Sequence, residues 1–232
     1  MTVYIEKPAV NLREELASLR NQGGYQEQQF YFDGLVTNGT FDTDTTGWTA
    51  DSLTTSDNAT LSNEGGQLKV TNTGNNGVAY QSFPTVSGKL YQFSVDLNYI
   101  TNTAYALRVG STLLGFDYVN DSKNTGAGET GAKTFTFVAT GSICYVTVGN
   151  LGVAGDYSLW DNISVFEIDA NDDVIHTMPK GWKPKDVYED GLLQREGAAY
   201  DYEVIYDGFD YKIKSTVAPS ATTQTCVIGV KA

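Results

Sequence analysis

The stretch YQFSVDLNY, residues 91–99, alternates with a period of two and places Tyr91, Phe93, Val95, Leu97 and Tyr99 on one side. A period of two is the spacing of side chains on one face of a β-strand. Similar short segments surround it, separated by turns rich in Gly, Asn and Ser: GQLKVTN, AYALRVG, KTFTFVATG, ICYVTVGN and LWDNISVFEI. About six to eight such strands in one run predict a mainly β fold, an antiparallel sandwich or jelly roll.

The composition agrees with a folded β protein and restricts its partners. The chain has 232 residues, of which 41% are hydrophobic and 12% aromatic, so a sizeable core is expected. Its formal net charge is −13 and its pI is about 4.3. A surface of this sign repels nucleic acid and anionic lipid, so we expect no nucleic-acid partner.

Two further features concern the compartment. Residues 1–20 contain three glutamates and no apolar stretch typical of a signal peptide, and no run approaches the ~20 apolar residues that cross a membrane. We therefore expect neither secretion nor membrane insertion. Cys144 and Cys226 lie far apart in strand-like segments, which predicts two buried free thiols and no disulfide.

The sequence divides into four segments. Residues 1–34 contain one amphipathic helix that begins with the pair Asn11 and Glu14, and this helix either folds back or docks on a partner. Residues 35–168 hold the strands of the sandwich. Residues 169–184, DANDDVIHTMPKGWKP, have the composition of a linker. Residues 185–232 predict a small β domain with turns at EDG and YDG.

Three stretches within residues 35–168 resemble the carbohydrate-binding-module jelly rolls found beside glycosidases and in phage proteins. They are LVTNGTFDTDTTGW (35–48), GVAYQSFPTVSGKLYQFSVDL and SLWDNISVFEI. The C-terminal segment resembles small β units of phage tail and fibre proteins, through DGLLQ, Gly197, the YDY of residues 200–202, Ala218-Pro219 and the strand 226–230. The N-terminal YIEKPAVNLREEL is similar to the start of virion proteins of short-tailed marine phages. Together these resemblances imply a phage virion accessory protein.

The jelly-roll resemblance implies a structural calcium ion where the first and last strands meet. Its ligands would be the side chains of Asp42 and Asp161, with backbone carbonyls around Asn38 and Thr40. The family commonly has a second acid where this chain has Asn162. The alternative is that Asp42 and Asp44 only cap a turn.

The same resemblance implies glycan binding through aromatic side chains, on which sugar rings stack. The candidate platforms are Trp48, Tyr80, Tyr99, Tyr105 and Trp160, with Tyr118 beside them. Arg108 and Asn98 are candidate partners of the sugar hydroxyls. The alternative is that these aromatic residues pack in the core or lie half-buried in the sheets.

No catalytic constellation is expected. The single histidine, His176, falls in the predicted linker without a serine or cysteine partner, and no phosphate-binding glycine loop is present. The leading hypothesis is a structural protein of a phage particle: a fibre, decoration or tail appendage in the virion. It would attach to other virion proteins through residues 1–34, assemble as a homotrimer and touch host-surface glycans. The rival hypotheses are a free-standing or secreted carbohydrate-binding protein and a purely architectural virion joint.

Overall fold

The computed structural model describes residues 27–32, 34–53, 59–102, 104–123, 130–171, 173–197, 201–215 and 225–231. Every regular element in these ranges is a β-strand, and the paired strands run antiparallel. Within the same ranges no helix is long and apolar enough to cross a membrane. The predicted helix after Asn11 lies outside the described residues.

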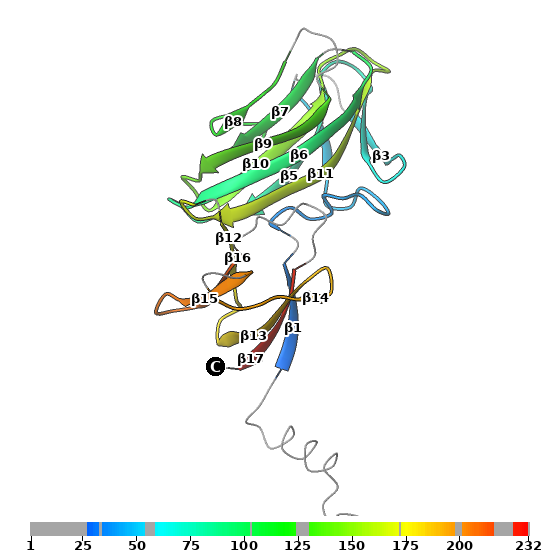
Figure 1. Cartoon of the computed structure of the whole chain (residues 1–232). Coiled ribbons are helices and arrows are strands. Elements are labelled where there is room, and N and C mark those ends of the chain that lie inside the picture. Colours follow the sequence, from blue (N-terminus) through cyan, green and yellow to red (C-terminus); the bar gives the residue numbers. More distant parts are fainter. Residues whose placement is uncertain are drawn as a thin grey trace, which may run out of the picture.

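The first sheet of the sandwich has five strands. Their order is β2 (Thr49–Ser52), β5 (Gly77–Pro84), β10 (Ile143–Asn150), β7 (Tyr105–Gly110) and β8 (Val119–Asn120). The second sheet packs on it, in the order β3 (Ala59–Asn63), β4 (Leu68–Asn72), β11 (Tyr157–Ile168), β6 (Leu90–Ile100) and β9 (Gly131–Val138). The two sheets form an antiparallel jelly-roll sandwich (Figure 1), which confirms the predicted fold class.

The core lies between these two sheets. Tyr91, Phe93, Val95 and Leu97 of β6 are at most 2% exposed, as their alternation predicts. Trp160 of β11 is fully buried, and its Nε1 donates a hydrogen bond of 2.8 Å to Ser158 Oγ. A buried indole N–H needs such a partner, so this bond lets the core accept a tryptophan.

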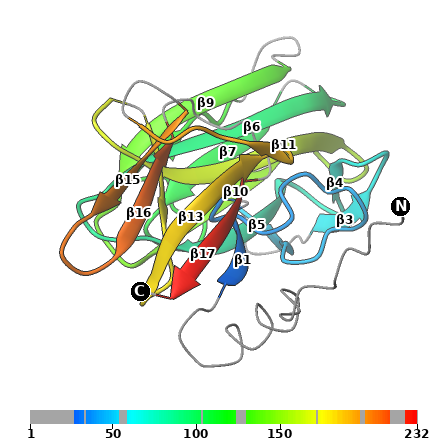
Figure 2. The same cartoon turned by 60° about the horizontal axis from the view of Figure 1, so that its bottom comes forward.

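A smaller β domain lies at one end of the sandwich. It contains a four-stranded sheet in the order β1 (Glu27–Phe32), β17 (Thr225–Lys231), β13 (Trp182–Glu189) and β14 (Leu192–Leu193). The strands β12 (Val174–Thr177), β16 (Tyr211–Ser215) and β15 (Tyr202–Tyr206) extend the second jelly-roll sheet past β11. Of these, β16 and β15 lie beside β13 of the four-stranded sheet (Figure 2). Between them lies a separate core of Met178, Val187, Tyr202, Ile213 and Val227.

Two segment boundaries differ from the sequence prediction. Strand β1 was expected in the N-terminal anchor, but it pairs with β17 along six residues, from Glu27↔Val230 to Phe32↔Thr225. Residues 169–184 were expected to be a linker, but they contain β12 and the start of β13. In β12 the buried Val174 and His176 alternate with Ile175, and the acidic residues before them hid this short strand pattern.

Both cysteines are free, as the sequence predicts, and Cys144 is buried whereas Cys226 is half-buried. Cys144 Sγ lies 3.4 Å from Thr85 Oγ1, and burial raises the pKa of its thiol. A buried thiol with a raised pKa is an inert core group.

Candidate glycan-binding face

The outer face of the five-stranded sheet brings two of the sequence candidates together. One row crosses all five strands, because Thr49 pairs with Tyr80, Tyr80 with Thr147, Thr147 with Arg108, and Arg108 with Asn120. These residues point away from the core, since their neighbours Ala79, Val146 and Val148, Leu107 and Val109 face inward. The row combines an aromatic ring, a guanidinium and hydroxyl and amide groups on one surface.

Arg108 is half-buried in this row and has few partners. Its Nε donates to Ser122 Oγ at 3.2 Å, and its Cζ lies 5.2 Å from the centroid of the Phe116 ring. Among the described residues no carboxylate pairs with it, and its two terminal nitrogens have no hydrogen-bond acceptor. Burial lowers the pKa of Arg108 below its usual value, but the group keeps its charge at neutral pH.

Thr147 lies between Tyr80 and Arg108 and is fully buried. Its hydroxyl has no hydrogen-bond partner in the described part of the chain. A buried hydroxyl without a partner costs about 1–3 kcal/mol. Such a group in a sheet interior is unusual, and a nearby polar ligand would relieve its cost.

The loop 111–118 forms one rim of this face. It returns close to the end of β7, where a Cβ on Gly110 would lie 2.4 Å from the carbonyl carbon of Gly115. Asp117 Oδ1 accepts a hydrogen bond of 2.9 Å from Ser111 N and closes the loop. The loop thereby holds Phe116, 56% exposed, against Arg108. On the other side of the row, the half-buried Tyr145 pairs with Ser82 and Gly110.

Three of the five predicted aromatic platforms are core residues. Trp48, Tyr105 and Trp160 are 7%, 2% and 0% exposed. Trp48 packs on Phe41 with ring centroids 5.6 Å apart, and Tyr105 meets Trp160 edge-on at 6.1 Å. A ring must present a free face to stack on a sugar, so the structure assigns these three residues to packing, the alternative that the sequence left open. Tyr118 also packs, on Phe137 at 5.3 Å.

Tyr99 is exposed but lies on the opposite sheet. The register between β6 and β11 shifts between Leu159 and Trp160, so Asn98 is extra and Tyr99 turns to the outer face. There its ring stacks on Tyr157 at 5.3 Å, and Lys69 Nζ lies 4.1 Å from the centre of the Tyr157 ring. Asn98 is therefore far from Arg108 in the fold, and the predicted polar partners do not belong to one site.

Residues 38–48 of the opening stretch form a loop that packs against β11, and we call this loop the closure motif. Asn38, with φ of 51°, donates through Nδ2 to the carbonyls of Asp44 and Thr46, and its own carbonyl accepts from Trp48 Nε1 at 3.2 Å. Gly39 lies so close to β11 that a Cβ there would be 1.9 Å from Ile163 O. Gly39 O accepts a hydrogen bond of 2.9 Å from Ile163 N. The motif therefore fastens the start of the sandwich to its last long strand.

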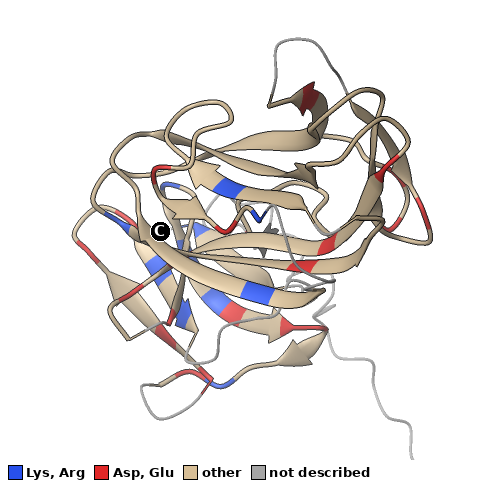
Figure 3. Cartoon of the chain, turned by 90° about the horizontal axis from the view of Figure 1, so that it is seen from above, with Lys and Arg blue, Asp and Glu red and all other residues tan. Residues whose placement is uncertain are grey.

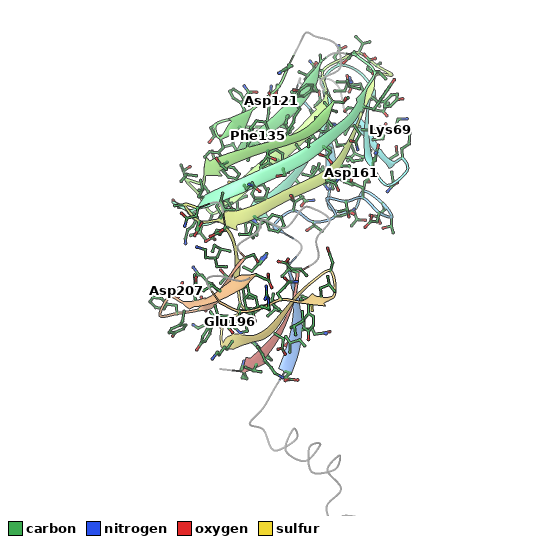
Figure 4. The ribbon with its side chains drawn as sticks, viewed as in Figure 1. Lys69, Asp121, Phe135, Asp161, Glu196 and Asp207 are labelled. Carbon is green, nitrogen blue, oxygen red and sulfur yellow. The ribbon has the colours of Figure 1, made fainter. Side chains whose placement is uncertain are left out.

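The expected calcium ligands are close but do not form a complete set. Burial raises the pKa of Asp161, and repulsion from Asp96 and Asp42 adds to this effect. Asp161 lies on the outer side of β11, on the same sheet as Lys69 (Figure 4). Asp42 accepts from Thr40 Oγ1 at 3.1 Å, and the carbonyl of Asn38 is already engaged by Trp48. Within the described ranges no three His, Cys, Asp or Glu side chains gather as a metal-binding group.

A cavity of about 380 Å³ lies where the jelly roll meets β12. Its walls are mostly apolar, and its lining residues are Gly34, Leu35, Pro84–Val86, Tyr91, Val165–Glu167 and Ile175–Thr177. Glu167 is the one charged lining residue, and it pairs with Lys89 at 3.2 Å. Burial lowers the pKa of His176 from its usual 6.5 to about 4, so this histidine is neutral at physiological pH.

No protein-family model and no curated protein sequence matches the chain. Similar solved structures include a family 4 carbohydrate-binding module, 15% identical, with a TM-score of 0.47 over 57% of this chain and 99% of that chain. A family 16 carbohydrate-binding module is 17% identical, with a TM-score of 0.40 over 56% of this chain and 98% of that chain. The enzymatically active domain of tailspike protein 4 of bacteriophage CBA120 is 14% identical, with a TM-score of 0.43 over 58% of this chain and 21% of that chain. By fold, this chain is a jelly-roll sandwich protein with an added β domain, and what its surface binds is inferred from its own residues.

Four residues of the face escaped the sequence prediction: Thr49, Phe116, Asn120 and Thr147. The sequence did indicate the side on which Thr147 lies, because Tyr145 and Thr147 are the polar residues that alternate with the apolar ones in the strand ICYVTVGN. The register that places Thr147 between Tyr80 and Arg108 pairs residues that are 67 and 39 positions apart in sequence, and alternation within one strand does not reveal it.

Proposed function

We propose that this protein is a non-catalytic structural component of a phage particle that binds glycans through the outer face of its five-stranded sheet. One observation carries the glycan part of this proposal. In the row Tyr80–Thr147–Arg108, a half-exposed tyrosine and a guanidinium without an ion-pair partner lie on either side of a buried hydroxyl that has no hydrogen-bond partner among the described residues. Sugars offer hydroxyls to such donors and C–H faces to such rings, so the three groups suit a saccharide.

The arrangement of the two domains supports an attached role. Because β1 pairs with β17, the chain enters the small domain at Glu27 beside Val230, at the end away from the jelly roll (Figure 1). The chain before β1 therefore joins the small domain at the end away from the jelly roll. The candidate glycan-binding face belongs to the jelly roll. In the proposed virion, residues 1–34 hold the protein on the particle as a homotrimer and the jelly roll points toward the host surface.

The glycan part is tested with two tyrosine variants on opposite sheets. Purified protein is screened on a glycan array, and the affinity for any bound glycan is measured by titration calorimetry for the wild type, Tyr80→Ala and Tyr99→Ala. Loss of a stacking ring costs about 1 kcal/mol or more, which is about fivefold or more in Kd. We expect Tyr80→Ala to lose binding and Tyr99→Ala to keep it. The reverse result moves the site to the opposite sheet, and no binding to any glycan leaves a purely architectural protein.

The assembly part is tested by sedimentation velocity on the full chain and on a truncation that begins at Glu27. This truncation keeps β1, so the small domain retains its edge strand. We expect a trimer for the full chain and a monomer for the truncation. A trimer in both places the contact in the described β domains, whereas a monomer in both contradicts self-assembly by this chain.

A further inference from the structure

We propose that the ligand of the face around Arg108 is an acidic glycan, whose carboxylate is bound by the terminal nitrogens of Arg108. This inference rests on the proposed glycan-binding function and adds the chemical class of the ligand. A neutral sugar would satisfy the tyrosine and the hydroxyl of the row. It would leave a partly desolvated guanidinium without a counter-charge.

The first argument is the charge balance of the chain. It contains 28 Asp and Glu residues against 15 Lys and Arg residues, and the acidic positions are spread over the described strands and turns (Figure 3). Six described lysines form ion pairs with carboxylates, for example Lys69 with Glu64 at 2.6 Å and Lys133 with Asp121 at 3.2 Å. Arg108 lies half-buried in this acidic protein and no described carboxylate reaches it. An unpaired, partly buried charge is unfavourable and needs a partner.

The second argument is the geometry of the guanidinium. Its Nε is held by Ser122 Oγ at 3.2 Å and its plane lies near the Phe116 ring, with 5.2 Å from Cζ to the ring centroid. These two contacts fix one edge of the group and leave the terminal N–H donors for a ligand. A carboxylate accepts two parallel N–H bonds from such a fork, whereas a hydroxyl accepts one.

The third argument concerns space and competition on the same face. The row spans five strands, about 19 Å at the usual strand spacing, which is enough for a short oligosaccharide. The acidic residue of the neighbouring row, Asp51, lies on β2, three strands from Arg108. At about 14 Å it does not neutralise Arg108 directly. A ligand carboxylate therefore meets Arg108 without a protein competitor among the described residues.

The net charge of the chain predicts how the affinity for an acidic glycan depends on the salt concentration. A protein with net charge −13 repels an anionic ligand at long range, and salt screens this repulsion. The contact with a half-buried Arg108 is screened less than the long-range field. We expect the affinity for an acidic oligosaccharide to stay constant or increase when the salt rises from ~10 mM to ~100 mM, over which the Debye length falls from about 30 Å to 10 Å. A patch of diffuse basic charge would show the opposite trend.

The test uses pairs of an acidic and a neutral probe: sialyllactose against its carboxyl-reduced form, which differ in one carboxylate, and tetragalacturonic acid against its carboxyl-reduced form, which differ in four. Calorimetry is carried out on the full chain for the wild type, Arg108→Gln, Arg108→Lys and Lys69→Gln. The last variant removes the same charge from the opposite sheet. We expect the wild type to bind at least one acidic probe about ten- to a hundredfold more tightly than its neutral partner, the range of a charge-assisted pair.

The variants separate this inference from the proposed function. Arg108→Gln should abolish the preference for the acidic probe, Arg108→Lys should retain part of it, and Lys69→Gln should leave it unchanged. Thermal unfolding of the four proteins checks that each is folded. Equal binding of acidic and neutral probes overturns the acidic inference and leaves the glycan-binding function standing. Failure to bind any probe overturns both, and an acidic preference that survives Arg108→Gln places the carboxylate elsewhere.

Discussion

Replacing Gly39 by Ala tests whether the closure motif holds the jelly roll together. The φ angle of Gly39 is not in the left-handed region, so an alanine meets no backbone strain. The new Cβ would instead lie 1.9 Å from Ile163 O and 2.9 Å from Ile163 C, both backbone atoms that cannot rotate away. The two segments must therefore separate by more than about 1 Å, since carbon and oxygen in contact need well over 3 Å.

That separation has a calculable cost. It breaks the hydrogen bond from Ile163 N to Gly39 O, worth about 1 kcal/mol, and loosens Phe41 and Trp48, which are 0% and 7% exposed. Complete loss of one large core side chain costs about 3–5 kcal/mol, and here packing is lost in part. We expect the free energy of unfolding to fall by about 3–4 kcal/mol and the Tm by roughly 10 °C.

The assay is urea unfolding followed by tryptophan fluorescence, beside thermal unfolding. Gly141→Ala is the matched control, because its Cβ would meet one atom, Ile143 O, at an ordinary 3.9 Å. The control should change stability by less than about 1 kcal/mol, and in the stabilising direction if only chain entropy acts. If Gly39→Ala proves as mild as Gly141→Ala, the close approach to β11 does not hold the sandwich.

Four more predictions follow from charges and pairing in the structure. The pKa of His176 is about 4 in the folded protein and near 6.5 when unfolded, so only the unfolded chain takes up a proton between these values. Lowering the pH from 6.5 to 4 therefore lowers the free energy of unfolding by up to about 3 kcal/mol. His176→Gln should reduce this pH dependence of stability, measured by urea titrations at pH 7 and 5. The raised pKa of Asp161 means that its charged form weakens the fold above that pKa, so Asp161→Asn should raise the Tm at pH 7 and lose this advantage in acid. If calcium binds at Asp42 and Asp161, added calcium should raise the Tm of the wild type and not of Asp161→Asn; equal calcium responses contradict that site. A truncation beginning at Gly34 removes the six-residue pairing of β1 with β17, so its small domain should unfold before its jelly roll, and hydrogen exchange in β17 that matches the Glu27 truncation would contradict this.

The sequence predicted which residues form strands better than it predicted on which face of a sheet each side chain lies. Alternation in residues 91–97 identifies the inward face of β6, because one buried face imposes its period directly on the sequence. The same alternation placed Tyr99 on the wrong face, since one extra residue at Asn98 reverses the side chains that follow. Bulges of this kind depend on the partner strand and leave little trace in the strand that contains them.

The candidate site was half visible in the sequence. Tyr80 and Arg108 were selected by residue type, and the structure brings them to one row. Trp48 and Trp160 were selected for the same reason and are buried, because a tryptophan in a β-sandwich serves the core as readily as a ligand. The exposed pair differs from the buried pair in the face of the strand on which each side chain lies and in the register between distant strands. Both are set only when the sheets assemble.

The pairing of β1 with β17 also sets an order of events during synthesis. Residues 27–32 leave the ribosome early, yet their partner is at residues 225–231. The strands of the jelly roll lie between them and can fold while translation continues, since domains fold as units as they emerge. A chain interrupted before residue 225 keeps its sandwich but leaves β1 without its partner strand, so an unfinished copy cannot fold the part of the proposed attachment segment, residues 1–34, that forms β1.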